Sequence, residues 1–445
     1  MNNKKEIITR TDKVKLKIGY EHVIARGCRY EENAWGEWQF PRPYNIHGRL
    51  VCSVDVSNDD IVSFGEPKRW YESKDTGNTW HEIFPKSEAE FGLLLPNGDR
   101  ICFPMESAVS IKEYKMPDWK MLTPAYDFNK RAIEGTLPQP DGMTYWLDGT
   151  VIKAYNADRL PPSLAKKEWH MERIPNGESV PVREQVKVDW PYLTRVVFTN
   201  TMDNVLKPIF PRGNPKIGPD GAIWITALSG EGHINPKNGK YSPYYSAELF
   251  RSEDNGHTFK QHAHMEYEAD GNEYPYRSGG FSDSDIEFMP DGSIVWFLRT
   301  AWAMFTGREW DPMYMSRSTD NGVTWSKPVK FADTGILPRL CRLECGTVLL
   351  CYARPGTFVC ACNDGKGLEW TNPVTVMTGD DRSGLHNLKI ENPTFHEWGG
   401  SCENPEIIPI DEKTAMLFYT DFYYPDEKGV KRKTVLCRKI TVLEE

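Results

Sequence analysis

Short apolar runs separated by tight turns recur along the whole chain. Five turns are clear, at 95–100, 147–150, 218–224, 289–295 and 344–349, and two weaker ones lie at 47–50 and 410–414. Glycine beside Asp, Asn or Pro between apolar runs is typical of β-hairpins. We find no pattern of a helical domain. The chain is therefore predicted to be all-β and built from antiparallel hairpins.

An octet with the pattern Ser-x-Asp-x-Gly-x-Thr-aromatic occurs three times, at 73–80, 252–259 and 318–325. A fourth copy at 362–370 carries a one-residue insertion and has lost the Ser and the Thr. In such a turn we expect the Asp to accept hydrogen bonds from backbone N–H groups two residues on, and the Gly to adopt positive φ. The terminal aromatic ring should enter the core between adjacent sheets.

These octets resemble the Asp-box of the sialidase-like β-propellers. The resemblance implies a ring of four-stranded antiparallel blades with the boxes on its rim, so Asp75, Asp254 and Asp320 are not expected to be catalytic. Seven candidate inner hairpins favour seven blades. Six stays open, because sialidases are six-bladed and the weakest hairpins can belong to insertions.

Both chain ends carry a strand-like segment. We expect residues 13–18 to pair with the last blade at 435–442, which closes the ring and hides both edges. The whole chain, 1–445, is thus predicted to be a single propeller domain.

Composition narrows the function. The chain has 54 Lys+Arg against 63 Asp+Glu, a net charge of −9, so it lacks the basic field that binds phosphate backbones. No stretch approaches the roughly 18 apolar residues of a membrane span, and no signal peptide is evident. The 10 cysteines fit no repeated zinc pattern, and we interpret them as free thiols. We expect a cytoplasmic protein without metal or cofactor, its oligomeric state open, unless a signal has been trimmed from it.

A Pro-Arg pair precedes three of the inner hairpins, at Arg42, Arg212 and Arg339. A guanidinium group binds a carboxylate bidentately and stays charged. Sialidases use an arginine triad in this way, so the resemblance implies that these residues bind an anionic sugar at the mouth of the axial channel. The alternative is that they pair with acids between blades. The Arg-Ile-Pro motif at 173–175 falls in a polar connecting segment and is given no role.

Carboxylates also gather ahead of the inner hairpins. Cleavage of a glycosidic bond needs an acid and a nucleophile or base on either side of it. Asp283 and Asp285 are the acid candidates, because their Gly- and Ser-rich flank permits a loop near the channel and their spacing puts them on one strand face. A solvated loop is the alternative. Glu403 and Glu406 are candidates for the partner role.

Other residues extend this set. Tyr419 or Tyr423 could serve as a tyrosine nucleophile of the kind that the resemblance implies. The insertion at 380–400 has the composition of a pocket wall, with Trp398 as a sugar-binding ring. His386 or His396 is the candidate proton-transfer group, and the alternative is that both are ordinary loop histidines.

The sequence therefore favours a carbohydrate-active enzyme with a glycan substrate. An exo-acting glycoside hydrolase of an acidic or deoxy sugar is the first hypothesis. A uronate lyase on the same scaffold and a non-catalytic propeller that binds glycan or protein are the alternatives. Several carboxylates near the channel favour an enzyme, because a plain binding platform does not need paired acids.

Overall fold

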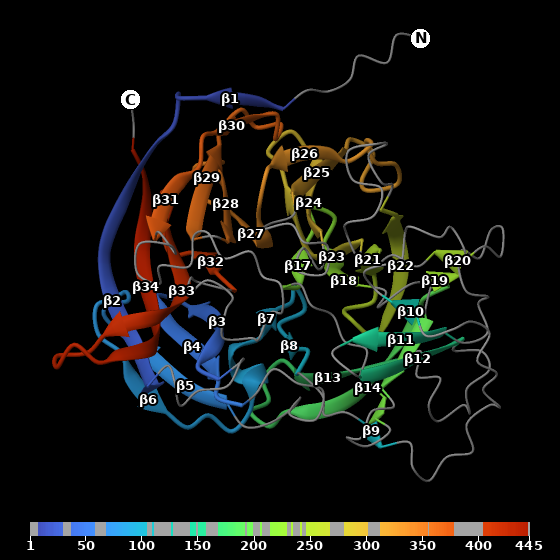
Figure 1. Cartoon of the computed structure of the whole chain (residues 1–445), viewed down its shortest axis with the longest axis horizontal. Coiled ribbons are helices and arrows are strands. Elements are labelled where there is room, and N and C mark those ends of the chain that lie inside the picture. The colour runs from blue at the N-terminus through green and yellow to red at the C-terminus, as the bar shows by residue number, and fades with distance from the viewer. Residues whose placement is uncertain are drawn as a thin grey trace.

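A computed structural model gives the fold of the chain (Figure 1). It describes residues 8–29, 37–57, 68–104, 109–110, 126–127, 143–147, 150–156, 168–191, 194–198, 205–206, 214–228, 233–234, 241–242, 246–267, 280–300, 312–354, 356–377 and 404–443. These residues form strands almost throughout, and the helical structure among them is one short 3-10 helix, η2 (Glu88–Phe91). No helix of the described part is long and apolar enough to cross a membrane.

The residues that the structure describes form six four-stranded antiparallel blades. The blades are arranged around a common axis (Figure 1). From the innermost strand outward, blade 1 consists of β3 (Gln39–Ile46), β4 (Arg49–Asp55), β5 (Lys68–Ser73) and β6 (His81–Ile83). Blade 2 consists of β7 (Leu93–Leu94), β8 (Arg100–Cys102), β13 (Glu168–Ile174) and β14 (Val182–Asp189). Blade 3 consists of β17 (Lys216–Ile217), β18 (Ile223–Leu228), β21 (Ala247–Ser252) and β22 (Thr258–Met265). The outer strands of blades 2 and 3 pair in parallel, which joins the two blades into one sheet.

Blades 4 to 6 complete the ring. Blade 4 consists of β23 (Phe281–Phe288), β24 (Ile294–Thr300), β25 (Met313–Ser318) and β26 (Val329–Ala332). Blade 5 consists of β27 (Ile336–Arg342), β28 (Val348–Ala353), β29 (Thr357–Cys362) and β31 (Val374–Met377). Blade 6 consists of β32 (Glu406–Pro409), β33 (Thr414–Pro425), β34 (Lys431–Leu443) and β2 (Lys15–Arg29). The outermost strand of blade 6 therefore comes from the beginning of the chain.

This closure confirms the predicted pairing of the two chain ends. Leu16 lies opposite Val442 and Ile18 opposite Ile440, in antiparallel register. A second N-terminal strand, β1 (Thr9–Thr11), pairs in parallel with β30 (Glu369–Thr371) on blade 5. The N-terminal segment thus ties blade 5 to blade 6 and covers the edge of β34.

One of the seven hairpins expected to be inner hairpins belongs to a smaller sheet outside the blades. The strands on either side of the 147–150 turn belong to a separate six-stranded sheet of β9 (Val109–Ser110), β10 (Tyr126–Asp127), β11 (Met143–Leu147), β12 (Thr150–Asn156), β15 (Thr194–Phe198) and β16 (Val205–Leu206). Its first four strands interrupt blade 2 between β8 and β13. The hairpin at 147–150 is thus part of an insertion, and the ring has six blades. A two-stranded sheet of β19 (His233–Ile234) and β20 (Tyr241–Ser242) is a further insertion.

The Asp-box turns form as hairpins, with a different set of contacts than expected. Asp75 Oδ1 accepts from the N–H of Thr79, four residues on, and its Oδ2 accepts from the Thr79 hydroxyl. The N–H of Gly77, two residues on, donates to Ser73 Oγ instead. Gly77 has φ +87°, as expected of a glycine in this turn. The same contacts recur around Asp254 and Asp320.

The fourth copy shows how the turn survives without its Ser and Thr. Asp364 accepts four backbone N–H groups, from Lys366 through Glu369, and the thiol of Cys362 donates to it in place of the missing hydroxyl. Backbone amides thus replace the side chains that were lost. The indole of Trp370 donates to the Gly367 carbonyl, as Trp80 and Trp325 do to theirs.

The box aromatics pack between neighbouring blades, as predicted. Trp370 of blade 5 meets Phe297 and Phe331 of blade 4 edge to face, with ring centroids 5.1 and 5.6 Å away. Phe259 of blade 3 packs on Phe103 and lies with Trp169 of blade 2 in one buried cluster. Burial of large rings between blades is the main favourable contribution to holding such a ring together.

Candidate functional site

Five polar residues occupy equivalent places near the start of the inner strands. Asp285 pairs with Phe297, Arg339 with Cys351 and Glu406 with Phe418. In each inner hairpin this pair lies three residues before the last pair of the ladder. Asn214 lies at the same distance before the turn in blade 3. Arg42 in blade 1 pairs with Ser53 of β4 and lies four residues before Ile46, the last paired residue of β3. We call these five residues the hub layer.

The same local backbone presents the charged members of this layer. In β3 and β27 the ladder shifts register immediately before the arginine, which is the signature of a β-bulge. A non-glycine residue with left-handed φ precedes the Pro of each Pro-Arg or Pro-Glu pair, namely Phe40 (φ 54°), Leu337 (φ 46°) and Asn404 (φ 67°). Such conformations are uncommon and cluster at functional positions.

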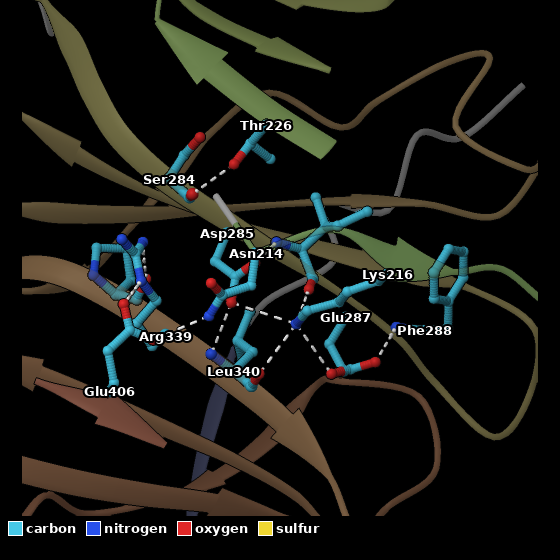
Figure 2. A network of polar contacts seen from close by, with 12 residues as sticks. Asn214, Lys216, Thr226, Ser284, Asp285, Glu287, Phe288, Arg339, Leu340 and Glu406 are labelled. Atoms are coloured by element: carbon cyan, nitrogen blue, oxygen red, sulfur yellow. Dashed lines mark hydrogen bonds and ion pairs between the residues drawn. The ribbon is translucent and has the colours of Figure 1, made fainter. Parts of the chain in front are cut away.

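Arg339 and Glu406 form the centre of the cluster (Figure 2). Arg339 Nε donates to Glu406 Oε1 at 2.7 Å, and Asn214 Nδ2 donates to Glu406 Oε2 at 2.9 Å. Burial alone would lower the pKa of the Arg339 guanidinium, but Glu406 and Asp285 outweigh it and raise that pKa. Arg339 therefore stays charged while 6 % exposed.

The Asn214–Glu406 contact also determines the shape of the hub. Asn214 belongs to blade 3 and Glu406 to blade 6, which are three blades apart in a ring of six. Their hydrogen bond therefore spans the axis.

Lys216, which is largely buried, links blade 3 to blades 4 and 5 beside the hub layer. Lys216 Nζ donates to Asp285 Oδ2 (3.2 Å), Glu287 Oε2 (3.0 Å) and the carbonyls of Ile286 (2.5 Å) and Leu340 (2.9 Å). Asp285 Oδ2 also accepts the N–H of Leu340 at 2.8 Å (Figure 2). Asp285 is thus occupied in joining blades 3, 4 and 5, which is a structural task.

Asp283 lies closer to the start of the same inner strand. Its carboxylate accepts from Arg299 of β24 at 2.7 Å and is 5 % exposed. It also contributes to the electrostatic field at Arg339, together with Glu406. Glu406 therefore contacts the guanidinium of Arg339 directly, and Asp283 is a buried carboxylate that pairs with Arg299.

Arg42 has a different set of partners. Arg42 Nη1 donates to Glu88 of η2 at 2.8 Å, and Lys68 and the Tyr44 hydroxyl contact the same carboxylate at 3.2 and 2.6 Å. Burial would raise the pKa of Glu88, but Lys68 and Arg42 outweigh it and lower the pKa to about 2. This cluster joins blade 1 to the helix that leads into blade 2.

The structure brings Asp283, Asp285, Arg339 and Glu406 together and places Arg42 in the same layer. Asp283 and Asp285 lie within β23 and are buried, so a loop position, solvated or beside the channel, is wrong for both. The ion pairs of Arg42 and Arg339 correspond to the pairing between blades that the sequence left open. Five predicted site residues lie outside the described part of the chain: Glu403, His386, His396, Arg212 and Trp398.

Tyr419 lies among core side chains rather than in this cluster. It is fully buried on β33, and its hydroxyl donates to Glu21 at 2.6 Å. Glu21 belongs to β2, the outermost strand of blade 6. Tyr423, the alternative, lies on β33 with Lys431 over its ring at 5.1 Å. A role for either tyrosine in chemistry stays a prediction.

Sequence reasoning missed Asn214, Lys216 and Arg299. The available signal is an Asn-Pro pair at 214–215, similar to the one at 404–405, directly before an inner hairpin. We instead followed the Pro-Arg pair two residues upstream, although register gives the hub-layer place to Asn214. Nothing in the local sequence of Arg299 indicates its partner.

The polar connecting segment expected around Arg173 is wrong, because Arg173 and Ile174 are buried residues of β13. The Arg173 guanidinium pairs with Asp99 at 2.7 Å and Glu184 at 3.0 Å and donates to the Asn255 carbonyl of the neighbouring blade. In the described ranges, no group of three or more His, Cys, Asp or Glu residues is arranged to hold a metal ion.

Comparisons with known proteins support the fold. No protein-family model and no curated protein matches the chain. A crystal structure of a protein of unknown function from Dyadobacter fermentans DSM 18053 matches with a TM-score of 0.53 at 18 % identity, over 96 % of this chain and 99 % of that one. At this identity the similarity concerns the fold alone.

Two further matches have lower scores. The Hadza microbial sialidase Hz136 gives a TM-score of 0.42 at 14 % identity, covering 90 % of this chain and 65 % of its own. An α-L-arabinanase from Penicillium chrysogenum, complexed with arabinobiose, gives 0.46 at 12 % identity over 96 % and 98 %. We draw no conclusion about this chain from TM-scores below 0.5.

Proposed function

We propose that this protein is a glycoside hydrolase that binds a sugar at the hub, with Asp283 and Glu406 as its pair of carboxylates. The observation that carries the proposal is that Glu406 pairs directly with Arg339 at 2.7 Å while the buried Asp283 lies on the neighbouring inner strand, paired with Arg299. Cleavage of a glycosidic bond needs two carboxyl groups in different environments. The Asp-box turns, which resemble those of sialidase-like enzymes, are consistent with this class.

The two carboxylates have different surroundings. Glu406 accepts hydrogen bonds from Arg339 and Asn214, which hold it in one orientation. This suits the nucleophile or base. Asp283, nearer the start of its strand, is assigned the general acid, and in that role its carboxyl group must carry a proton while Arg299 donates to it at 2.7 Å. Arg339 lies where it can stabilise charge that develops between them.

An exo mode of action on an acidic or deoxy sugar is what the resemblance of the Asp-box octets suggests, and it stays part of this proposal.

The test is a panel of 4-nitrophenyl glycosides and reducing-end assays on oligosaccharides, with wild type, Asp283→Asn and Glu406→Gln. We expect each variant to reduce kcat/KM by at least about 100-fold, as is typical when a general acid or base is removed. Asp333→Asn, which alters an exposed pair with Lys330, is the matched control and should leave activity unchanged. Wild-type activity that survives both site variants would contradict the proposal, and absorbance from unsaturated uronate would identify a lyase instead.

A further inference from the structure

Asparagine is followed directly by glycine at five places in the chain, at 97–98, 176–177, 238–239, 255–256 and 321–322. Asparagine deamidates fastest when glycine follows it, because glycine has no side chain to hinder the attack of its backbone nitrogen. The pair at 238–239 lies outside the described residues. The other four share the same reactive dipeptide, and the structure distinguishes them.

Deamidation uses the glycine nitrogen as a nucleophile. The nitrogen loses its proton and attacks Cγ of the asparagine, the bond from Cγ to Nδ2 breaks, and ammonia leaves. A five-membered succinimide ring remains, and water opens it at either carbonyl to give aspartate or isoaspartate. A glycine N–H that donates a hydrogen bond has to break that bond before it can react, so it is protected.

Three of the four glycine N–H groups are protected in this way. Gly98 donates to the Leu95 carbonyl at 2.9 Å. Gly256 and Gly322 lie in Asp-box turns, and each donates at 2.9 Å to the serine hydroxyl of its own box. Both box glycines are also buried, so water has little access to them.

Gly177 differs from the other three glycines. It is exposed, with φ +84°, and apart from its chain neighbours no heavy atom lies within 4 Å of the place that a Cβ would take. Within the described part of the chain, its N–H donates to no acceptor. Asn176 is exposed as well, in the connection between β13 and β14. We propose that Asn176 is a site of spontaneous deamidation, with Gly177 as the source of the nitrogen and water as the co-reactant.

The modification weakens a contact between two turns of blade 2. Asn176 Nδ2 donates to the Asn97 carbonyl at 3.1 Å, and the Asn176 N–H donates to Asp99 Oδ1 at 2.9 Å. The product has a carboxylate in place of the amide. It therefore loses the donor to Asn97 and adds a negative charge near the carboxylate of Asp99.

The first experiment compares the four sites in one sample of folded protein kept at mildly alkaline pH. Trypsin releases them in separate peptides, at 87–100, 174–183, 252–260 and 318–330. Mass spectrometry measures the deamidated fraction of each peptide over time, and synthetic peptides of the same sequences give the rate without a fold. We expect the ratio of folded to peptide rate at Asn176 to exceed each of the other three ratios at least about fivefold, because their N–H groups must first break a hydrogen bond. A ratio at Asn176 that is equal to or below the others overturns the proposal.

The second experiment tests the effect of the modification on the turns. Asn176→Asp reproduces one of the two products. Ser179→Asp adds a carboxylate to the same exposed connection and is the matched control. We expect a lower thermal midpoint for Asn176→Asp than for Ser179→Asp, and equal midpoints would show that the contact between the turns is not weakened. Neither experiment depends on the hydrolase proposal.

Discussion

At the scale of single residues, Lys216 shows what a buried charge requires. Its ammonium group is surrounded by four oxygens from two neighbouring blades. Burial by itself would lower its pKa, but Asp285 and Glu287 outweigh that effect and raise the pKa, so the lysine stays protonated. The cation in turn compensates two carboxylates that have almost no access to water.

Lys216→Met should therefore destabilise the protein strongly. The variant leaves Asp285 and Glu287 as buried charges without their cation, and loss of one partner of such a pair costs about 3–5 kcal/mol. Urea unfolding followed by tryptophan fluorescence measures the change. Lys330→Met removes a lysine from an exposed pair and should cost less than about 1 kcal/mol. Equal free energies of unfolding for Lys216→Met and Lys330→Met would contradict a stabilising role of Lys216.

At the scale of elements, the pair of strands β21 and β22 contains a buried carboxylate outside the hub layer. Glu248 is fully buried and accepts from the Ser246 hydroxyl at 2.5 Å and from the Gln261 amide. His264 lies opposite it in register and contacts it through Nδ1 at 2.9 Å, while Nε2 reaches Glu266 at 3.3 Å. Burial lowers the pKa of His264, and the two glutamates outweigh it, so the net shift is upward.

This shift predicts a pH dependence of stability. A histidine whose pKa is raised on folding stabilises the fold fully below its unfolded pKa, near 6.5, and the contribution disappears as pH rises through the folded value. His264→Gln should therefore lower the free energy of unfolding more at pH 5.5 than at pH 9, measured by urea titration. His262→Gln, on the same strand, is the matched substitution at a histidine that does not contact Glu248. A His264 effect that grows with pH would contradict the argument.

At the scale of the whole molecule, stability depends on closing the ring. The first and last parts of the chain share blade 6, where β2 covers β34. Val14, Leu16 and Ile18 pack on the core cluster between blades 5 and 6. Without them, β34 would present an open edge to solvent, and such edges invite pairing with other chains.

Deletion of residues 1–18 should therefore destabilise the ring and promote association. Loss of three half-buried or buried aliphatic side chains removes on the order of 3–6 kcal/mol. We expect a lower thermal midpoint and, by size-exclusion chromatography with light scattering, larger species than the full chain forms. Deletion of residues 1–7 ends before these contacts and is the control. Equal thermal midpoints for the two deletions would show that residues 8–18 do not stabilise the closed ring.

The architecture could be predicted because its signals are local. The Asp-box turns are formed by contacts such as Asp75 to Thr79, within eight residues, so a repeated octet is enough to reveal them. The extra hairpin could not be sorted correctly, because the turn at 147–150 has the same residues whether its strands join a blade or an insertion. Only the pairing partners of β11 and β12 distinguish the two cases.

The sequence by itself determined the all-β fold, the Asp-box turns and the strand that closes the ring, because turn chemistry and apolar periodicity act between neighbours in the chain. The tertiary structure decided which charges meet. Asn214 and Glu406 are 192 residues apart, and Lys216 and Leu340 are 124 apart. Such contacts arise when six inner strands converge on one axis, and local propensity does not encode which side chains then become partners.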